Sequence, residues 1–185
     1  MKKLIRFLLI IILILSLLVV YARYGGTRGL ITKEYQIETT IDDSFDGLKI
    51  VHFSDLHYLR IINKETTQSI IEEINLLNPD IVVFTGDLID KNYKPNDKDI
   101  SNLKELLTSI KSKYGKYSVL GEHDTKIEDT IKDIYISSNF TLLDNSYDVI
   151  YGDNNNKLFI GGLSNNPDID KVMNYFTEND DINYK

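Results

Sequence analysis

Short runs of β-forming residues alternate with helical patterns through the middle of the chain. The runs that predict buried strands are 48–53 (LKIVHF), 81–84 (IVVF) and 117–120 (YSVL). Residues 65–77 and 101–114, between them, have the spacing of amphipathic helices. A strand-helix-strand unit needs about 30 residues and returns the chain to the same edge of a sheet. The pattern therefore predicts an α/β fold, with a β-sheet core of βαβ units flanked by helices.

The pattern continues on both sides of this region. Thr125 and Glu128 resemble a capping box that opens a third helix at 126–137. Further strands are expected at 141–143, 147–151 and 157–160, with the last two forming a hairpin, and a final helix at 168–177 capped by Asp168. Residues 34–41 alternate as a strand for the edge of a sheet.

The N-terminus carries a long apolar run. Lys2, Lys3 and Arg6 precede sixteen uncharged residues, 7–22, and Leu4 and Ile5 extend the run to nearly the 20 or so residues that span a bilayer. A secretory signal peptide is the alternative, but its apolar region is usually only about 7–15 residues long. We therefore interpret residues 1–24 as a cytoplasmic tip and one transmembrane helix, 25–34 as a linker, and 35–185 as the globular domain.

Charge and cysteine content exclude some partners and sites. The six Lys and Arg residues of 1–33 are accompanied by no acid, so the rest of the chain carries 15 of the 21 basic residues and all 28 acidic ones. Because nucleic acid is bound by neutralising its phosphates with Lys and Arg, we expect no nucleic-acid partner. The chain has no cysteine, which excludes disulfides and thiolate metal sites.

Acidic and histidine residues directly follow three of the predicted strands, as Asp55-Leu56-His57, Gly86-Asp87 and Gly121-Glu122-His123-Asp124. The carboxyl ends of parallel strands meet at one edge of a sheet, where open α/β sheets bind ligands. Carboxylate and imidazole groups suit Mn, Fe or Zn ions, and one carboxylate can bridge two ions about 3.5–4 Å apart. Each motif alone commonly marks a polar turn. Their order and spacing together predict a metal-dependent phosphoesterase site with Asp55, His57 and Asp87 as first ligands.

These motifs resemble the signature of the calcineurin-like metallophosphoesterase superfamily, which reads D-x-H, G-D, G-N-H-D/E and then two further histidine segments. An N-terminal membrane segment followed by the sequence HFSDLH at 52–57 is similar to its membrane-associated bacterial branch. The resemblance implies a metallophosphoesterase fold in which Asp55 and His57 bind the first metal ion, Asp87 bridges, and position 122 binds the second. It also implies that His123 protonates the leaving group or stabilises the transition state, and that Asp124 orients His123.

Two departures from the superfamily pattern concern the second metal ion. Glu122 stands where the superfamily has asparagine, which keeps an oxygen ligand but adds a negative charge. No histidine follows His123, so Glu122 and Asp87 would give the second ion at most two ligands, where a catalytic metal typically has three. We therefore expect 35–185 to be the N-terminal portion of an incomplete phosphoesterase domain, lacking the second-metal ligands on which activity depends.

The function that follows is hydrolysis of a phosphomonoester, phosphodiester or pyrophosphate bond at the membrane surface, with two divalent ions, Mn, Fe or Zn, as cofactors. The substrate is a small or a lipid-linked phosphate ester. The basic residues on either side of the apolar run are nearly balanced, so charge and the resemblance together place the catalytic portion outside a single-pass anchor in the cell membrane. The alternative is a non-catalytic, membrane-tethered metal-binding or scaffold domain.

Three polar residues near the predicted site are assigned other roles. His52 lies within a strand, where a hydrogen bond in the sheet is more common than metal binding. Asp80 precedes its strand and so belongs to the opposite edge of the sheet. Residues 90–99 (DKNYKPNDKD), which include Asp90, are interpreted as a solvated loop.

Overall fold

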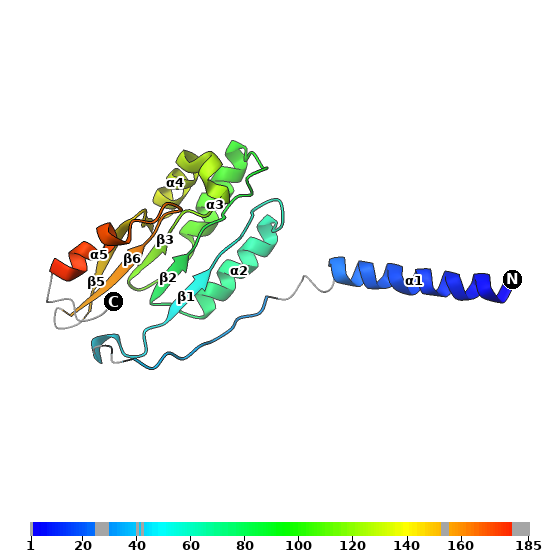
Figure 1. Ribbon diagram of the computed structural model, residues 1–185, viewed down its shortest axis with the longest axis horizontal. Coiled ribbons are helices and arrows are strands. Elements are labelled where there is room, and N and C mark those ends of the chain that lie inside the picture. Colours follow the sequence, from blue (N-terminus) through cyan, green and yellow to red (C-terminus); the bar gives the residue numbers. More distant parts are fainter. Residues whose placement is uncertain (1, 25–29, 40, 42, 153–155, 179–185) are drawn as a thin grey trace. The chain divides into compact units, whose positions relative to one another are not determined.

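A computed structural model describes residues 2–24, 30–39, 41, 43–152 and 156–178 (Figure 1). The chain divides into two compact units, Met1–Glu38 and Thr39–Lys185.

The first unit contains one long helix, α1 (Lys2–Tyr24). Its residues 2–21 have a mean hydropathy of 3.0, and all of these side chains are exposed. A helix of 23 residues is roughly 35 Å long, enough to cross the hydrocarbon core of a bilayer. This helix is therefore a candidate membrane span, although a signal sequence near the N-terminus has the same length and composition.

The edge strand expected at 34–41 is not found among the described residues of that range. Residues 34–39 and 41 belong to neither a helix nor a strand, and the side chains of 34–39 are exposed. Alternation of polar and apolar residues favours a strand only where one face is buried against a partner. The prediction was wrong for the described residues of this segment, none of which pairs with a strand.

The second unit is built on a four-stranded parallel sheet in the order β1-β2-β3-β4. The strands are β1 (Ile50–Phe53), β2 (Ile81–Phe84), β3 (Gly115–Ser118) and β4 (Phe140–Leu142), and the helices between them are α2 (Lys64–Leu76), α3 (Asp97–Thr108) and α4 (Glu128–Ser137). Parallel crossovers are right-handed, so strands in consecutive order keep their helices on one face (Figure 1). The predicted α/β class is confirmed.

The main core lies between this sheet and its helices. Its fully buried members include Val82 and Phe84 of β2, Leu103 and Leu107 of α3, and Ile131 of α4. The helix spacing expected for α2 is confirmed, because its residues 71 and 74 are also buried in this cluster. Burying one such side chain stabilises the fold by about 1.5–3 kcal/mol.

The other face of the sheet is covered by a hairpin. Strands β5 (Ser146–Tyr151) and β6 (Lys157–Gly162) pair antiparallel, which confirms the predicted hairpin; the expected turn residues 153–155 lie outside the described residues. A second buried cluster joins this hairpin to the sheet and to the short 3-10 helix η1 (Asp43–Phe45). Helix α5 (Ile169–Glu178) packs Val172 against the hairpin, and Asp168 caps its first turn as expected, by accepting a hydrogen bond from the Lys171 N–H.

Some predicted boundaries were wrong, for local reasons. Helix α3 begins at Asp97, four residues early, because Asn96 and Asp99 form a capping box that the helical spacing did not reveal. Thr125 does not cap α4. Its Oγ1 donates to the Glu122 carbonyl inside a 3-10 helix, η2 (His123–Ile127), and α4 begins only at Glu128.

Lys116 of β3 is a buried cation, with only 6% of its surface exposed. Its Nζ donates a 2.9 Å hydrogen bond to the carbonyl of Leu107, near the C-terminus of α3, and lies 4.9 Å from the centroid of the Phe140 ring. Both contacts favour a positive charge. Burial is the stronger effect and lowers the pKa of Lys116 to about 8.

The stability of the native chain is therefore expected to rise between about pH 8 and pH 10.5 relative to a Lys116→Met variant. In this range the unfolded chain keeps a proton on Lys116 that the folded chain has lost, so the contribution grows with pH, to on the order of 3 kcal/mol. Urea unfolding of both proteins in detergent micelles, followed by tyrosine circular dichroism at several pH values, measures it. Parallel pH profiles for the two proteins would contradict this expectation. The raised pKa of Tyr117, caused by burial and by its bond to Asp148, acts in the opposite direction at higher pH in both proteins.

Candidate metal centre

The polar segments that follow β1 and β2 are joined by backbone hydrogen bonds. The N–H of Asp55 donates to the Gly86 carbonyl, that of His57 to Asp87, and that of Tyr58 to Leu88, with distances from 2.9 to 3.1 Å. These bonds continue the pairing of the two strands beyond their ends. The positions of residues 55, 57 and 87 are therefore set by backbone hydrogen bonds and do not depend on contacts between their side chains.

The backbone in these segments adopts conformations that most residues avoid. Asp55, His57 and Asp87 have positive φ angles of 56°, 39° and 59°. Such left-handed residues cost free energy and are concentrated at functional sites. Gly86, with φ of 93°, lies so close to Gly121 that a Cβ on Gly86 would be 2.1 Å from the Gly121 nitrogen. The segments after β2 and β3 are therefore in direct backbone contact.

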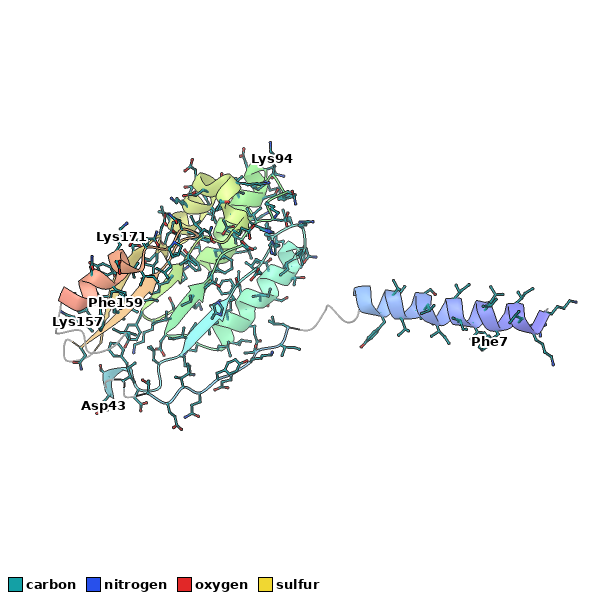
Figure 2. All side chains as sticks on the ribbon, in the orientation of Figure 1. Phe7, Asp43, Lys94, Lys157, Phe159 and Lys171 are labelled. Carbon is teal, nitrogen blue, oxygen red and sulfur yellow. The ribbon has the colours of Figure 1, made fainter. Side chains whose placement is uncertain are left out.

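Side chains from all three segments converge at this edge. One ligand atom each from His57, Asp87 and His123 lies within 4.8 Å of the others. The rings of the two histidines have centroids 4.8 Å apart, and the backbone N–H of His123 donates to Oδ1 of Asp87. Nε2 of His57 is 3.9 Å from Oδ2 of Asp87 and 3.7 Å from Oδ1 of Asp55. In Figure 2 Lys94 marks the loop that follows β2 at this edge.

Glu122 has a different position from the other expected ligands. Its side chain is exposed, and among the residues that the structure describes it does not belong to the group formed by His57, Asp87 and His123. Asp55 is also exposed, with 65% of its side chain accessible, but it remains in contact distance of His57.

Asp124 is fully buried, and three backbone N–H groups donate to its carboxylate. Its Oδ2 accepts hydrogen bonds from the N–H groups of Asp87 and Gly121, and its Oδ1 accepts one from Leu88, all at 2.9 Å. Burial raises the pKa of the Asp124 carboxyl, while these three bonds act in the opposite direction. Asp124 therefore fixes the backbone that carries Asp87 and the start of the His123 segment.

Asp90 is a component of the site that the sequence interpretation missed. It was assigned to a solvated loop, yet it is 1% exposed. Its Oδ2 lies 3.8 Å from Nδ1 of His57 and 3.6 Å from Nδ1 of His123, and it also contacts Arg60. A hydrogen bond from the Asn92 N–H is the main cause that lowers the pKa of Asp90, with a further contribution from Arg60. The burial of Asp90 could have been predicted from the apolar pair Leu88-Ile89, which indicates that the chain is still in the core just before Asp90.

The donor set fits divalent metal ions. Nδ1 of His57 and Nδ1 of His123 are buried and make no hydrogen bond, and both face the Asp90 carboxylate. An imidazole that directs Nδ1 towards a carboxylate leaves Nε2 free for a metal ion. Oxygen donors from Asp87 and Asp55 beside imidazole nitrogen match Mn, Fe or Zn.

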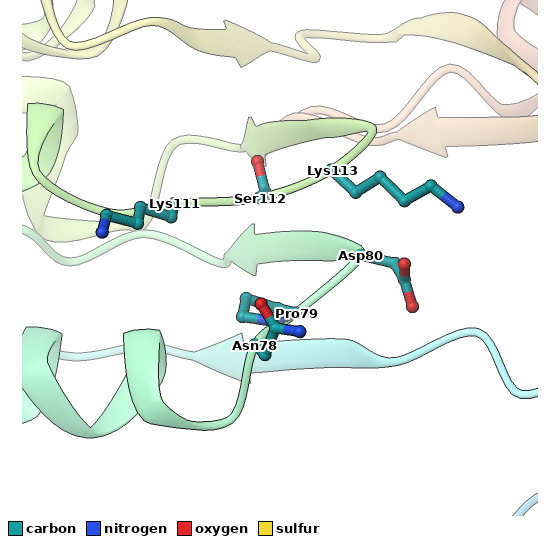
Figure 3. Close-up of a pocket in the computed structure, with 6 residues that line it drawn as sticks. All are labelled: Asn78, Pro79, Asp80, Lys111, Ser112 and Lys113. Atoms are coloured by element: carbon teal, nitrogen blue, oxygen red, sulfur yellow. The ribbon is translucent and has the colours of Figure 1, made fainter.

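The other polar residues near the three motifs lie outside this cluster. Nε2 of His52 is 2.8 Å from Oγ1 of Thr85, as expected for a histidine hydrogen-bonded in the sheet. Asp80 accepts a hydrogen bond from the Lys49 N–H. It lines a pocket of about 330 Å³ before the amino ends of β2 and β3, together with Asn78, Pro79, Lys111, Ser112 and Lys113 (Figure 3). That pocket lies at the opposite edge of the sheet from the metal centre.

Comparison with known proteins identifies the family. The model of the calcineurin-like phosphoesterase family matches residues 48–183, which is most of the chain and contains every residue of the cluster. The chain belongs to this family. Its members are phosphoester hydrolases that generally use a dinuclear metal centre, and the cluster of His57, Asp87 and His123 has the donor atoms that could hold a metal ion.

Three relatives illustrate the range of the family. The chain is 31% identical over 167 residues to the uncharacterized metallophosphoesterase YkuE of Bacillus subtilis (strain 168), covering 85% of this chain and 57% of that protein. It is 30% identical over 119 residues to a transmembrane protein with metallophosphoesterase domain from Danio rerio, covering 61% of this chain and 25% of that protein. It is 35% identical over 78 residues to the UDP-2,3-diacylglucosamine pyrophosphatase LpxG of Chlamydia muridarum, covering 42% and 23%. The chain thus spans at most 57% of the length of these relatives.

Proposed function

We propose that this chain provides a metal centre for the hydrolysis of phosphate esters. The observation that carries the proposal is the convergence of His57, Asp87 and His123 within 4.8 Å at the carboxyl edge of the sheet. These residues come from three separate segments. Backbone bonds join the first two segments, and the carboxylates of Asp87 and Asp124 join the second to the third. Membership of a phosphoesterase family gives this centre its substrate class.

Each residue of the centre has a proposed role. Asp55 and His57 bind a first divalent ion, Asp87 bridges two ions, and Glu122 is the candidate ligand for the second. Bound Mn, Fe or Zn ions would supply an activated water molecule and neutralise the charge on the phosphoryl oxygens. His123, whose Nδ1 faces Asp90, is left with Nε2 to hand a proton to the leaving oxygen. Asp124 supports the segment from which His123 extends.

The setting of the reaction is proposed from α1. An uncleaved α1 would hold residues 35–185 at the outer surface of the cell membrane, with 1–24 as the anchor and 25–34 as the linker. The relative LpxG is named for a pyrophosphatase that acts on a diacylated, UDP-linked glucosamine. A lipid-linked phosphate ester or pyrophosphate is therefore a proposed substrate, beside small soluble phosphate esters.

Replacing Asp87 with asparagine is the direct test. The amide removes a negative charge between the two histidines, so Mn²⁺ affinity is expected to fall by about 10-fold or more, and Mn²⁺-dependent hydrolysis of a nitrophenyl phosphodiester by the same factor or more. Calorimetric titration and nitrophenol release, both with the full chain in detergent micelles, measure the two effects. Asp129→Asn is the matched control, because Asp129 is an exposed carboxylate at the start of α4.

The outcome separates two functions. Mn²⁺ binding with turnover that Asp87→Asn abolishes supports the hydrolase. Mn²⁺ binding without turnover on monoesters, diesters or pyrophosphates favours the non-catalytic metal-binding domain, a role consistent with the exposed position of Glu122. A folded native chain that binds no Mn²⁺, Fe²⁺ or Zn²⁺ would refute the proposed metal centre.

A further inference from the structure

One oxygen atom connects the two histidines of the centre to a cation. Oδ2 of Asp90 is the atom that faces Nδ1 of His57 at 3.8 Å and Nδ1 of His123 at 3.6 Å, and the same oxygen contacts Nη1 of Arg60. The other oxygen, Oδ1, accepts a hydrogen bond from the Asn92 N–H at 2.8 Å. Among the described residues, the carboxylate therefore accepts one hydrogen bond on each oxygen, and the bond on the oxygen that faces the imidazoles comes from Arg60.

Arg60 belongs to the same turn as His57. The N–H of Arg60 donates to the His57 carbonyl at 3.1 Å, and the turn is closed by a 2.7 Å bond from the Leu59 N–H to the Ile62 carbonyl. The Leu59 backbone is left-handed, with φ of 65°. The turn therefore places the His57 ring in the metal centre and the Arg60 guanidinium against the Asp90 carboxylate on the other side of that ring.

We propose that Arg60 is a positioning residue of the metal centre. By holding Oδ2 of Asp90, Arg60 keeps a carboxylate oxygen behind both imidazoles, so that each ring carries a proton on Nδ1. Nε2 of His57 then faces the metal ions, and Nε2 of His123 faces the site, where it can take up and pass on the proton for the leaving oxygen. This role rests on the proposed function of the centre. It predicts an effect of a residue that is itself no metal ligand and stands half-exposed, with 52% of its side chain accessible.

A guanidinium suits this role better than an ammonium group. The planar fork of arginine has a fixed orientation relative to the carboxylate, whereas lysine contributes a charge at the end of a flexible stem. Without the cation, the Asp90 side chain keeps only the Asn92 bond on the oxygen remote from the histidines, and it can rotate. Both imidazoles then lose the nearby negative charge, 3.6 to 3.8 Å away, that favours a proton on Nδ1.

The tautomers can be observed directly, because the chain has only three histidines. Long-range ¹H–¹⁵N spectra of the full chain in detergent micelles, recorded without metal at about two pH units above the ordinary histidine pKa of about 6.5, report which nitrogen carries the proton. His52→Gln identifies the signal of the third histidine. The variants to compare are Arg60→Gln, which removes the charge, Arg60→Lys, which keeps it, and Lys98→Gln, which makes the same charge change at an exposed position of α3.

The native chain and Lys98→Gln are expected to show His57 and His123 protonated at Nδ1. Arg60→Gln is expected to show a mixture of both tautomers and to bind Mn²⁺ about 10-fold or more weakly, as found when residues that support metal ligands are removed. Arg60→Lys should recover part of both properties, since it restores the charge but not the fork. Circular dichroism like that of the native chain shows that each variant is folded.

Two results overturn the inference or separate it from the proposed function. If folded Arg60→Gln keeps the native tautomers and a Mn²⁺ affinity within about twofold of the native chain, Arg60 is not a positioning residue, even though the centre binds metal. The native chain could instead bind no metal while Arg60→Gln still changes the tautomers. Arg60 then acts on the histidines through Asp90 as proposed, and the proposed function of the metal centre is refuted.

Discussion

Replacing Asp124 with alanine is expected to lower the free energy of unfolding by at least about 3 kcal/mol. The carboxylate accepts hydrogen bonds from three backbone N–H groups, those of Asp87, Leu88 and Gly121, and it is fully buried. Alanine leaves all three donors without this partner, and the N–H of Leu88 is buried, whereas those of Asp87 and Gly121 are partly buried. Urea unfolding of the full chain in detergent micelles, followed by the circular dichroism of its 12 tyrosines, measures the loss.

Two further variants show that the backbone bonds are the cause. Asp124→Asn can keep the two bonds to Oδ2 if its carbonyl takes that position, but its amide then opposes the Leu88 N–H, so a smaller loss is expected. Asp129→Ala removes an exposed carboxylate at the start of α4 and should change stability by less than about 0.5 kcal/mol. The explanation is wrong if Asp124→Ala is as stable as Asp129→Ala.

The second large effect is expected for Gly86→Ala, which should cost about 3 kcal/mol or more and also weaken Mn²⁺ binding. The new Cβ would be 2.1 Å from the Gly121 nitrogen and 2.5 Å from its Cα, and backbone atoms at this place cannot turn aside like a flexible side chain. The segments after β2 and β3 must separate, which moves Asp87 away from His123. Urea unfolding and calorimetric Mn²⁺ titration measure the two losses.

Gly47→Ala is the matched control for this variant. Gly47 also has a positive φ, of 72°, but no atom lies within 4 Å of a Cβ built there. It should therefore show only the cost of a left-handed alanine, about 1 kcal/mol, and unchanged Mn²⁺ affinity. Equal losses for the two glycines would mean that the contact between the two segments does not matter.

The strands and the motifs that follow them could be predicted because their signals are local. A run such as 81–84 is β-forming over its whole length, and Asp87 follows it directly. Helix α3 was placed too late because its start depends on one pair, Asn96 and Asp99, within a uniformly polar stretch. The edge strand at 34–41 could not be judged from alternation alone, since a strand also requires a neighbour with free backbone groups.

The metal centre was less predictable wherever a residue acts through the tertiary structure. Asp90 was assigned to solvent because it begins a polar stretch, and its burial depends on two histidines and an arginine that lie 30 or more residues away along the chain. Asp124 accepts hydrogen bonds from backbone N–H groups, and such bonds leave no pattern of side chains in the sequence. Motif spacing identified the clustered residues His57, Asp87 and His123, and also Asp124, but neither Asp90 nor the backbone partners of Asp124.

Backbone hydrogen bonds between the segments after β1 and β2 fix where a metal-binding side chain is attached, whichever residue type stands there. The N–H groups of residues 55, 57 and 58 are tied to carbonyl groups of residues 86–88, so the main chain follows the same path whichever side chains project from it. Exchanging the carboxylate at position 55 or 87 for an amide or an imidazole would then change the chemical hardness and the charge of the ligand atom, while the Cα atom of that residue stays in place. Such a scaffold allows ion preference to diverge between descendants of one ancestor by single replacements, without rebuilding the sheet.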